Sequence, residues 1–117
     1  MKLTTAEIEE IITYEIVVDS YTDDEVNMGW AIYMEENISY PFEAEYEVKQ
    51  KGGKKHWTKV MVVDNETDDS NFEGSSYYVE IEYKGILIPV ELSELRNIKA
   101  DEETMKTLQV WQYKQNY

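Results

Sequence analysis

The chain has 117 residues, and its 25 acidic residues outnumber its 11 basic ones, which gives a net charge of −14. This length suits one domain with one core. The charge disfavours nucleic acids and anionic membrane surfaces as partners, because both attract clustered Lys and Arg. The absence of cysteine excludes disulfides, thiolate catalysis and cysteine-based zinc sites.

The acidity has two readings. It either keeps a folded protein soluble, or it is compensated by a bound divalent cation, because like charges repel one another in the compact state. Ten Tyr, three Trp and two Phe indicate a folded chain rather than a disordered acidic one. No signal peptide and no apolar run of ~18 residues is present, so we expect a cytoplasmic protein.

The first forty residues predict two helices. Thr4 followed by Glu7 is a capping box, and isoleucines follow at helical spacing up to Ile16. The β-branched residues of 11–18 also allow a strand, but we favour a helix. Thr22 and Glu25 repeat the capping pattern before a second helix. Its apolar stripe comprises Val26, Trp30, Tyr33, Met34 and Ile38, and Pro41 ends it near Asn37.

From Phe42 the pattern changes to alternation, which predicts a strand over 42–49 with one dry face. Lysines surround a turn at Gly52-Gly53, and a second strand is expected over 57–63. A loop over 64–76 precedes a third strand over 77–83. A fourth run over 86–92 contains Pro89, which indicates an edge or a bulge. Residues 93–98 predict a short helical turn, and 101–113 a last helix with Asp101 as N-cap.

Short strands joined by tight turns favour a small barrel. The expected fold class is α+β, with N-terminal helices, a small antiparallel β-barrel and a C-terminal helix. We expect a single domain over 1–117, divided into a helical part at 1–39, a barrel at 40–98 and the last helix at 101–113.

Catalytic patterns are absent from the sequence. His56 is the single histidine and lies beside lysines at a turn, where nothing orders it for nucleophilic catalysis. The five glycines form neither a Walker loop nor a dinucleotide fingerprint. The carboxylates occur in exposed clusters rather than as a glycosidase pair across a cleft. We therefore predict that the protein is not an enzyme.

Two stretches carry the oxygen ligands that calcium prefers. The first is Glu35-Glu36-Asn37, where the last carbonyls of a helix lack internal partners. The second is the loop with Asp64, Glu66, Asp68 and Asp69. This loop is not an EF-hand, because its sixth position is Asp69 rather than Gly. Either stretch could also be an acidic solvated surface.

The chain resembles the CcbP family of small acidic bacterial calcium-binding proteins. The resemblance rests on residues 14–21, on Met28-Gly29-Trp30, on 33–38 and on Tyr40-Pro41-Phe42, with 79–83 and 88–90 farther on. It implies an SH3-like barrel and calcium ions bound by acidic surface residues. It also implies a role in sequestering cytoplasmic calcium, for buffering or signalling. It supports Glu35-Glu36-Asn37 best, and Asp19 in the first matched segment joins the candidate ligands.

An alternative function is an SH3-like acidic interaction module that binds a basic partner, since exposed tyrosines favour interfaces. The sequence does not identify a protein partner. For a calcium protein we expect selectivity over magnesium, which demands near-octahedral geometry. We also expect the helix-end site to bind more tightly than the 64–69 loop, because ordering a loop costs ~1–2 kcal/mol per residue.

Overall fold

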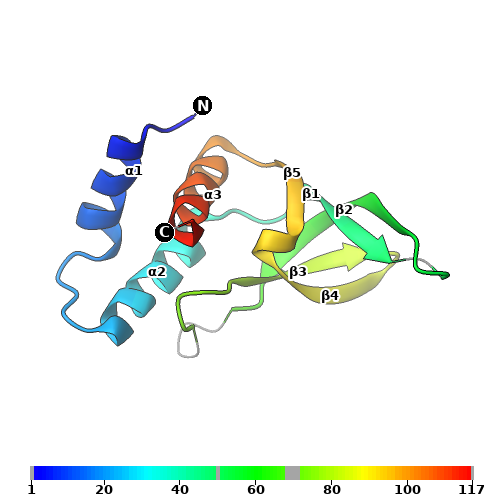
Figure 1. The fold of residues 1–117 in the computed structure, drawn as a ribbon, viewed down its shortest axis with the longest axis horizontal. Helices are drawn as coiled ribbons and strands as arrows, with labels where there is room; N and C mark the ends of the chain where they lie inside the picture. The colour runs from blue at the N-terminus through cyan, green and yellow to red at the C-terminus, as the bar shows by residue number, and fades with distance from the viewer. Residues whose placement is uncertain (1, 50, 68–71, 117) are drawn as a thin grey trace.

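The structure, a computed structural model, describes residues 2–49, 51–67 and 72–116. Its helices gather at one end and an antiparallel sheet occupies the other, within extents of 49 × 31 × 24 Å (Figure 1). The C-terminal helix α3 returns to the helical end, where it contacts both α1 and α2. The α+β class with helices segregated from an antiparallel sheet is therefore confirmed.

Helix α1 covers Thr5–Ile11 and continues into a π-helical turn, Ile12–Ile16. The expected capping box is present. Glu7 N donates to Thr4 Oγ1 over 3.1 Å, and Thr4 N donates to Glu7 Oε1 over 3.0 Å. Ile8, Ile11 and Ile16 are buried. The helix prediction is confirmed, and the strand alternative for 11–18 is wrong for 11–16.

Helix α2 covers Asp23–Asn37 and ends where Pro41 predicted. Glu25 N donates to Thr22 Oγ1 over 3.1 Å, but the Glu25 carboxylate meets the Thr22 hydroxyl instead of the backbone N–H. The buried face includes Trp30, Tyr33 and Met34. This anchored face fixes the backbone at the C-terminal end of the helix.

Five strands form one sheet in the order β4-β3-β2-β1-β5. Their bounds are Phe42–Lys49 for β1, Lys55–Asn65 for β2, Tyr78–Tyr83 for β3, Ile86–Glu91 for β4 and Leu95–Lys99 for β5. β4 is an edge strand, as Pro89 predicted. Among the described residues no ladder joins β4 to β5, so the sheet is open and the SH3-like barrel is not confirmed.

Two sequence expectations need correction. Asp64 and Asn65 belong to β2 rather than to the loop, because β3 pairs with them after a register shift between Val62 and Asp64. The helical turn expected over 93–98 is present only at its start: a 3₁₀ turn covers Leu92–Glu94 and leads into β5. The β1–β5 pairing includes a hydrogen-bonded ion pair of 2.9 Å between Arg96 and Glu45, 51 residues apart in sequence. Local patterns do not reveal such a partner.

Helix α3 covers Glu102–Gln115, with Asp101 as its N-cap, as expected. Its buried face carries Val110 and Trp111 together with two fully buried threonines. Thr104 accepts a hydrogen bond of 2.9 Å from Ser39 N, which ties the segment after α2 to α3. The Trp111 ring lies 6.0 Å from Trp30 and 5.9 Å from Tyr77, centroid to centroid, so the core joins helices and sheet.

Candidate metal centre

The C-terminal end of α2 presents the first predicted acidic stretch. Glu35 and Glu36 are exposed and Asn37 is half-buried, and no basic residue lies in the last turn. Asn37 Nδ2 donates to Tyr33 O over 2.9 Å, and Ile38 N donates to Met34 O over 3.2 Å. Of the last four carbonyls of the helix, that of Met34 is thus engaged, and the two carboxylates are the main side-chain ligands this segment offers.

The second acidic stretch begins inside the sheet. Asp64 lies directly opposite Glu80 of β3, and directly opposite residues of an antiparallel pair share one face. Glu66 N donates to Tyr78 O over 3.0 Å, which continues the pairing past the end of β2. Glu66 follows Asp64 by two residues and returns to the same face. Asp64, Glu66 and Glu80 therefore share one face at this end of the β2–β3 pair.

The carboxylates of Glu66 and Glu80 interact directly. A hydrogen bond with Glu66 raises the pKa of Glu80 above its ordinary value, and partial burial and the charges of Glu66 and Asp64 raise it further. Two carboxyl groups that share a proton in this way concentrate negative charge once the proton leaves. A cation could replace the proton and use the same oxygens as ligands.

Tyr40 connects the two stretches. Burial raises the pKa of its hydroxyl, and the neighbouring Tyr77 and the charges of Asp64 and Glu35 raise it further. The pKa of Tyr77 is also raised by burial and then by the charge of Glu35. The charge of Glu35 at the end of α2 thus acts on both tyrosine hydroxyls, and the charge of Asp64 near the end of β2 acts on that of Tyr40.

The other residues that the sequence predicts as ligands are not seen at the β2–β3 end or beside Glu35. Asp19 is exposed, has a left-handed backbone (φ 60°) and precedes the N-terminus of α2. A helix of 15 residues is about 22 Å long at ~1.5 Å per residue, which separates Asp19 from Glu35. Asp68 and Asp69 lie outside the described residues.

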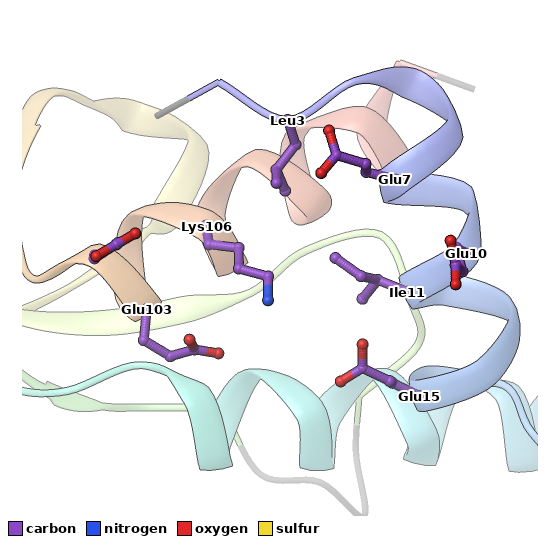
Figure 2. A pocket seen from close by; sticks show the side chains of 8 residues that line it. Leu3, Glu7, Glu10, Ile11, Glu15, Glu103 and Lys106 are labelled. Atoms are coloured by element: carbon purple, nitrogen blue, oxygen red, sulfur yellow. The ribbon is translucent and has the colours of Figure 1, made fainter.

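A second acidic surface lies between α1 and α3. It is a groove of about 590 Å³ whose lining includes Glu7, Glu10, Glu15, Glu103 and Lys106. Figure 2 shows the Lys106 side chain extending into the space between the two helices, with carboxylates around it. Hydrogen bonds from Thr4 and, more weakly, the Lys106 charge lower the pKa of Glu7. This groove thus already holds a cation of the chain itself.

The donors at the α2 end fit calcium chemically, because they are carboxylate oxygens with tolerant geometry. Within the described ranges, however, no three acidic or histidine side chains are grouped closely enough to hold a metal ion as they stand. Calcium binding here would therefore draw Glu35, Asp64, Glu66 and Glu80 together.

Sequence reasoning missed Glu80, Tyr40 and Tyr77 as parts of this centre. The alternation of β3 places Glu80 on the wet face, but only the β2–β3 register sets it opposite Asp64. Tyr40 stands before the proline that ends the second predicted helix, and Tyr77 begins the alternating run of the third predicted strand. Neither local pattern shows that the two hydroxyls are buried.

Comparisons with known proteins agree with this chemistry. A family model described as calcium binding, of the CcbP type, matches residues 10–114. The crystal structure of Anabaena CcbP superposes with a TM-score of 0.78 at 24% identity, covering 96% of this chain and 91% of that one. A calcium-binding protein in the calcium-binding form gives a TM-score of 0.71 at 24% identity, with 95% and 94% covered.

These likenesses show a shared fold. No curated protein sequence matches the chain significantly. None of the described helices has the length and apolar character needed to cross a membrane. The family is described by the binding of an ion rather than by catalysis, in agreement with the prediction of a calcium ligand and no enzymatic activity. With the family model matching most of its length, the chain belongs to the CcbP family of calcium-binding proteins.

Proposed function

We propose that this protein binds calcium where the end of α2 meets the β2–β3 pair. Glu35, Glu36, Asp64, Glu66 and Glu80 would be the ligands, with Asn37 supporting the helix end. The observation that carries the proposal is that Asp64, Glu66 and Glu80 share one face at the end of the β2–β3 pair. The coupled pair of Glu66 and Glu80 extends the same acidic surface.

Selectivity for calcium over magnesium is part of the proposal. Magnesium requires near-ideal octahedral geometry and loses its water reluctantly, whereas calcium accepts 6–8 oxygens in irregular arrangements. Ligands that come from a helix end and two strands, and that must move to meet the ion, suit the larger and more tolerant cation.

The proposed role is calcium sequestration in the bacterial cytoplasm, for buffering or for signalling. The net charge of −14 supports a capacity for cations, and a chain without cysteine suits a reducing compartment. Fractionation of cells that produce the protein would test the compartment. Free calcium measured with and without its overproduction would test sequestration.

Calorimetric calcium titration tests the site itself, with magnesium as competitor. We expect Glu35→Gln and Asp64→Asn each to weaken calcium binding by about tenfold, or ~1.4 kcal/mol. Glu10→Gln, which removes the same charge in the α1–α3 groove, is the matched control and should leave affinity unchanged. If the control weakened binding as strongly as the two site variants, or if magnesium displaced calcium at modest excess, the proposed site would be wrong.

A second candidate function is an acidic interaction module for a basic protein. The observation in its favour is the exposure of Tyr14 and Tyr21, at 71% and 85%, and of Met28 and Ile32 on the outer face of α2. Exposed large side chains flanked by carboxylates suit a partner that is both apolar and basic. The calcium titration separates the two functions, because an interaction module alone would show no saturable calcium binding at physiological salt.

A further inference from the structure

A pocket of about 600 Å³ lies at the hairpin between β1 and β2, at the end of the sheet that points away from the helices (Figure 1). Three lysines contribute to its wall, and none of the described residues that line it is acidic. The lining includes Lys49, Lys51 and Lys84 together with His56, Thr58 and Tyr83. A basic pocket is the opposite of what a chain with a net charge of −14 leads one to expect.

The strands place the floor of this pocket on the core face of the sheet. His56 and Thr58 precede the buried Val60 at intervals of two along β2, so their side chains project from the same face. Tyr83 stands in the same relation to the buried Ile81 of β3. All three polar side chains are half-buried. The floor of the pocket is therefore held by regular strand pairing, at the point where the apolar core gives way to solvent.

The imidazole of His56 points to a missing partner. Its Nδ1 atom is buried and has no hydrogen-bond partner among the described residues. Buried polar atoms nearly always have one, so an exception calls for an explanation. A ring nitrogen that carries its proton donates a hydrogen bond. The pocket thus offers a donor for which the described part of the chain supplies no acceptor.

The lysines of the pocket are likewise not neutralised. No salt bridge among the described residues involves Lys49, Lys51 or Lys84, whereas Lys55 on the same hairpin pairs with Glu47 at 3.9 Å. Lys49 also lies directly opposite Lys55 in the β1–β2 ladder, and like charges at such a position destabilise a sheet. An anion in the pocket would relieve this repulsion.

We propose that the pocket binds the phosphate group of a small molecule, with its lysines neutralising the charge and His56 Nδ1 donating a hydrogen bond to a phosphate oxygen. A phosphate group carries about −1.5 to −2 charges at pH 7 and three acceptor oxygens, which suits several cations and one N–H donor. Lysine commonly binds phosphate, whereas a carboxylate is met best by the fork of an arginine. The single arginine of the chain, Arg96, is already bonded to Glu45.

A small ligand suits this molecule better than a nucleic acid strand or a membrane. The pocket volume lies in the range typical of small-molecule sites. A single phosphate group senses mainly the charges within about 8 Å at physiological salt, whereas a long polyanion would also meet the acidic remainder of the chain. Asp64 follows His56 by eight residues along β2, about 26 Å at ~3.3 Å per residue. The pocket is therefore separate from the proposed calcium centre and does not depend on it.

Calorimetric titration of the full chain with inorganic phosphate and with glycerol 3-phosphate tests the proposal, with glycerol as the uncharged control. We expect saturable binding of both phosphate compounds at physiological salt and no binding of glycerol. Lys51→Gln, Lys84→Gln and His56→Leu should each weaken binding by about tenfold, because each removes a charge or a donor that faces the phosphate. Lys54→Gln is the matched control, since it removes the same charge from the same hairpin outside the lining. Its affinity should stay within about twofold of the parent.

Thermal melting without phosphate gives a second readout for His56→Leu. The variant removes a polar atom that is unpaired in the free protein, so its melting temperature should stay the same or rise. A lower melting temperature with unchanged phosphate affinity would show that Nδ1 has a structural role only, and the proposal would be wrong.

Three further results would overturn the proposal. The first is the absence of saturable binding of either phosphate compound. The second is an equal loss of affinity in Lys54→Gln and Lys84→Gln, because the hairpin would then attract anions by its overall charge. The third is binding of a single-stranded oligonucleotide or of anionic phospholipid vesicles without binding of the small phosphates, which would indicate a macromolecular partner.

Discussion

Glu80 is a proposed calcium ligand, and folding raises the pKa of its carboxyl group. Its pKa is raised from an ordinary 4.5 by its hydrogen bond to Glu66, by burial and by neighbouring negative charge. The folded protein therefore holds this proton more tightly than the unfolded chain does. The stabilisation from the shared proton is complete at pH values below the unfolded pKa and is lost as the pH rises through the raised value.

Glu80→Gln tests this linkage. We expect the variant to be more stable than the parent at pH 7 in chelator, since the repulsion among Glu80, Glu66 and Asp64 is relieved. The loss of parent stability as the pH rises from 4.5 should be smaller in the variant. Melting temperatures across this pH range provide the measurement.

Calcium binding by Glu80→Gln should be weaker than in the parent, because calcium and the proton compete for the same oxygens. Glu47→Gln, on the neighbouring strand β1 and paired with Lys55 at 3.9 Å, is a control that removes a carboxylate outside the site. Equal calcium affinity in parent and Glu80→Gln would remove Glu80 from the ligand set.

Among the elements, the contact between α2 and the π-helical turn depends on a glycine. A Cβ built on Gly29 would lie 2.3 Å from the carbonyl oxygen of Ile16. Backbone cannot yield as a flexible side chain does, so the two helices approach this closely only because position 29 lacks a side chain. Close packing against the Ile16 carbonyl thus explains why the Met28-Gly29-Trp30 motif has glycine at its centre.

Gly29→Ala should destabilise the protein even though alanine is the better helix former by ~1 kcal/mol. Overpacking against backbone typically costs about 1–3 kcal/mol, and we expect a net loss toward the upper part of that range. Urea unfolding in chelator measures it. Met28→Ala, at a position 51% exposed on the same helix, is the control and should change stability little. A Gly29→Ala variant as stable as the parent would show that the π-helical turn moves away at no cost.

At the scale of the whole molecule, charge compensation is unevenly distributed. The four salt bridges found among the described residues all use glutamates of β1: Lys55–Glu47, Lys59–Glu43, Arg96–Glu45 and Lys99–Glu43. The sheet around β1 therefore uses several of the 11 basic residues. The carboxylates at the end of α2 and of β2 have no salt bridge of this kind, so a bound cation would relieve repulsion where it is greatest.

Calcium should accordingly raise the melting temperature beyond what ionic strength achieves. At a calcium concentration ~100 times the dissociation constant, one site adds ~2.7 kcal/mol to the free energy of unfolding. Sodium chloride should reproduce only the screening of charges. The comparison is made by thermal melting with calcium and with chelator at matched ionic strength. Equal melting temperatures under the two conditions would contradict specific binding.

The sequence by itself determined the features that depend on neighbours along the chain. The capping residues Thr4, Thr22 and Asp101 were identified correctly, because a cap forms within one helical turn. Strand β1 was predicted with its observed bounds, because period-two alternation is a local signal. The acidic stretch at Glu35 was recognised for the same reason, together with the chain's resemblance to its family.

Only the tertiary structure decided which of these features meet. β5 forms because β1 offers a free edge fifty residues earlier, and Asp64 joins β2 because β3 pairs with it across a register shift. The position of Glu80 opposite Asp64 follows from the β2–β3 register, and the burial of Tyr77 follows from a core to which helices and sheet both contribute. A metal centre requires side chains to converge in space, and convergence between distant segments has no signature in local sequence.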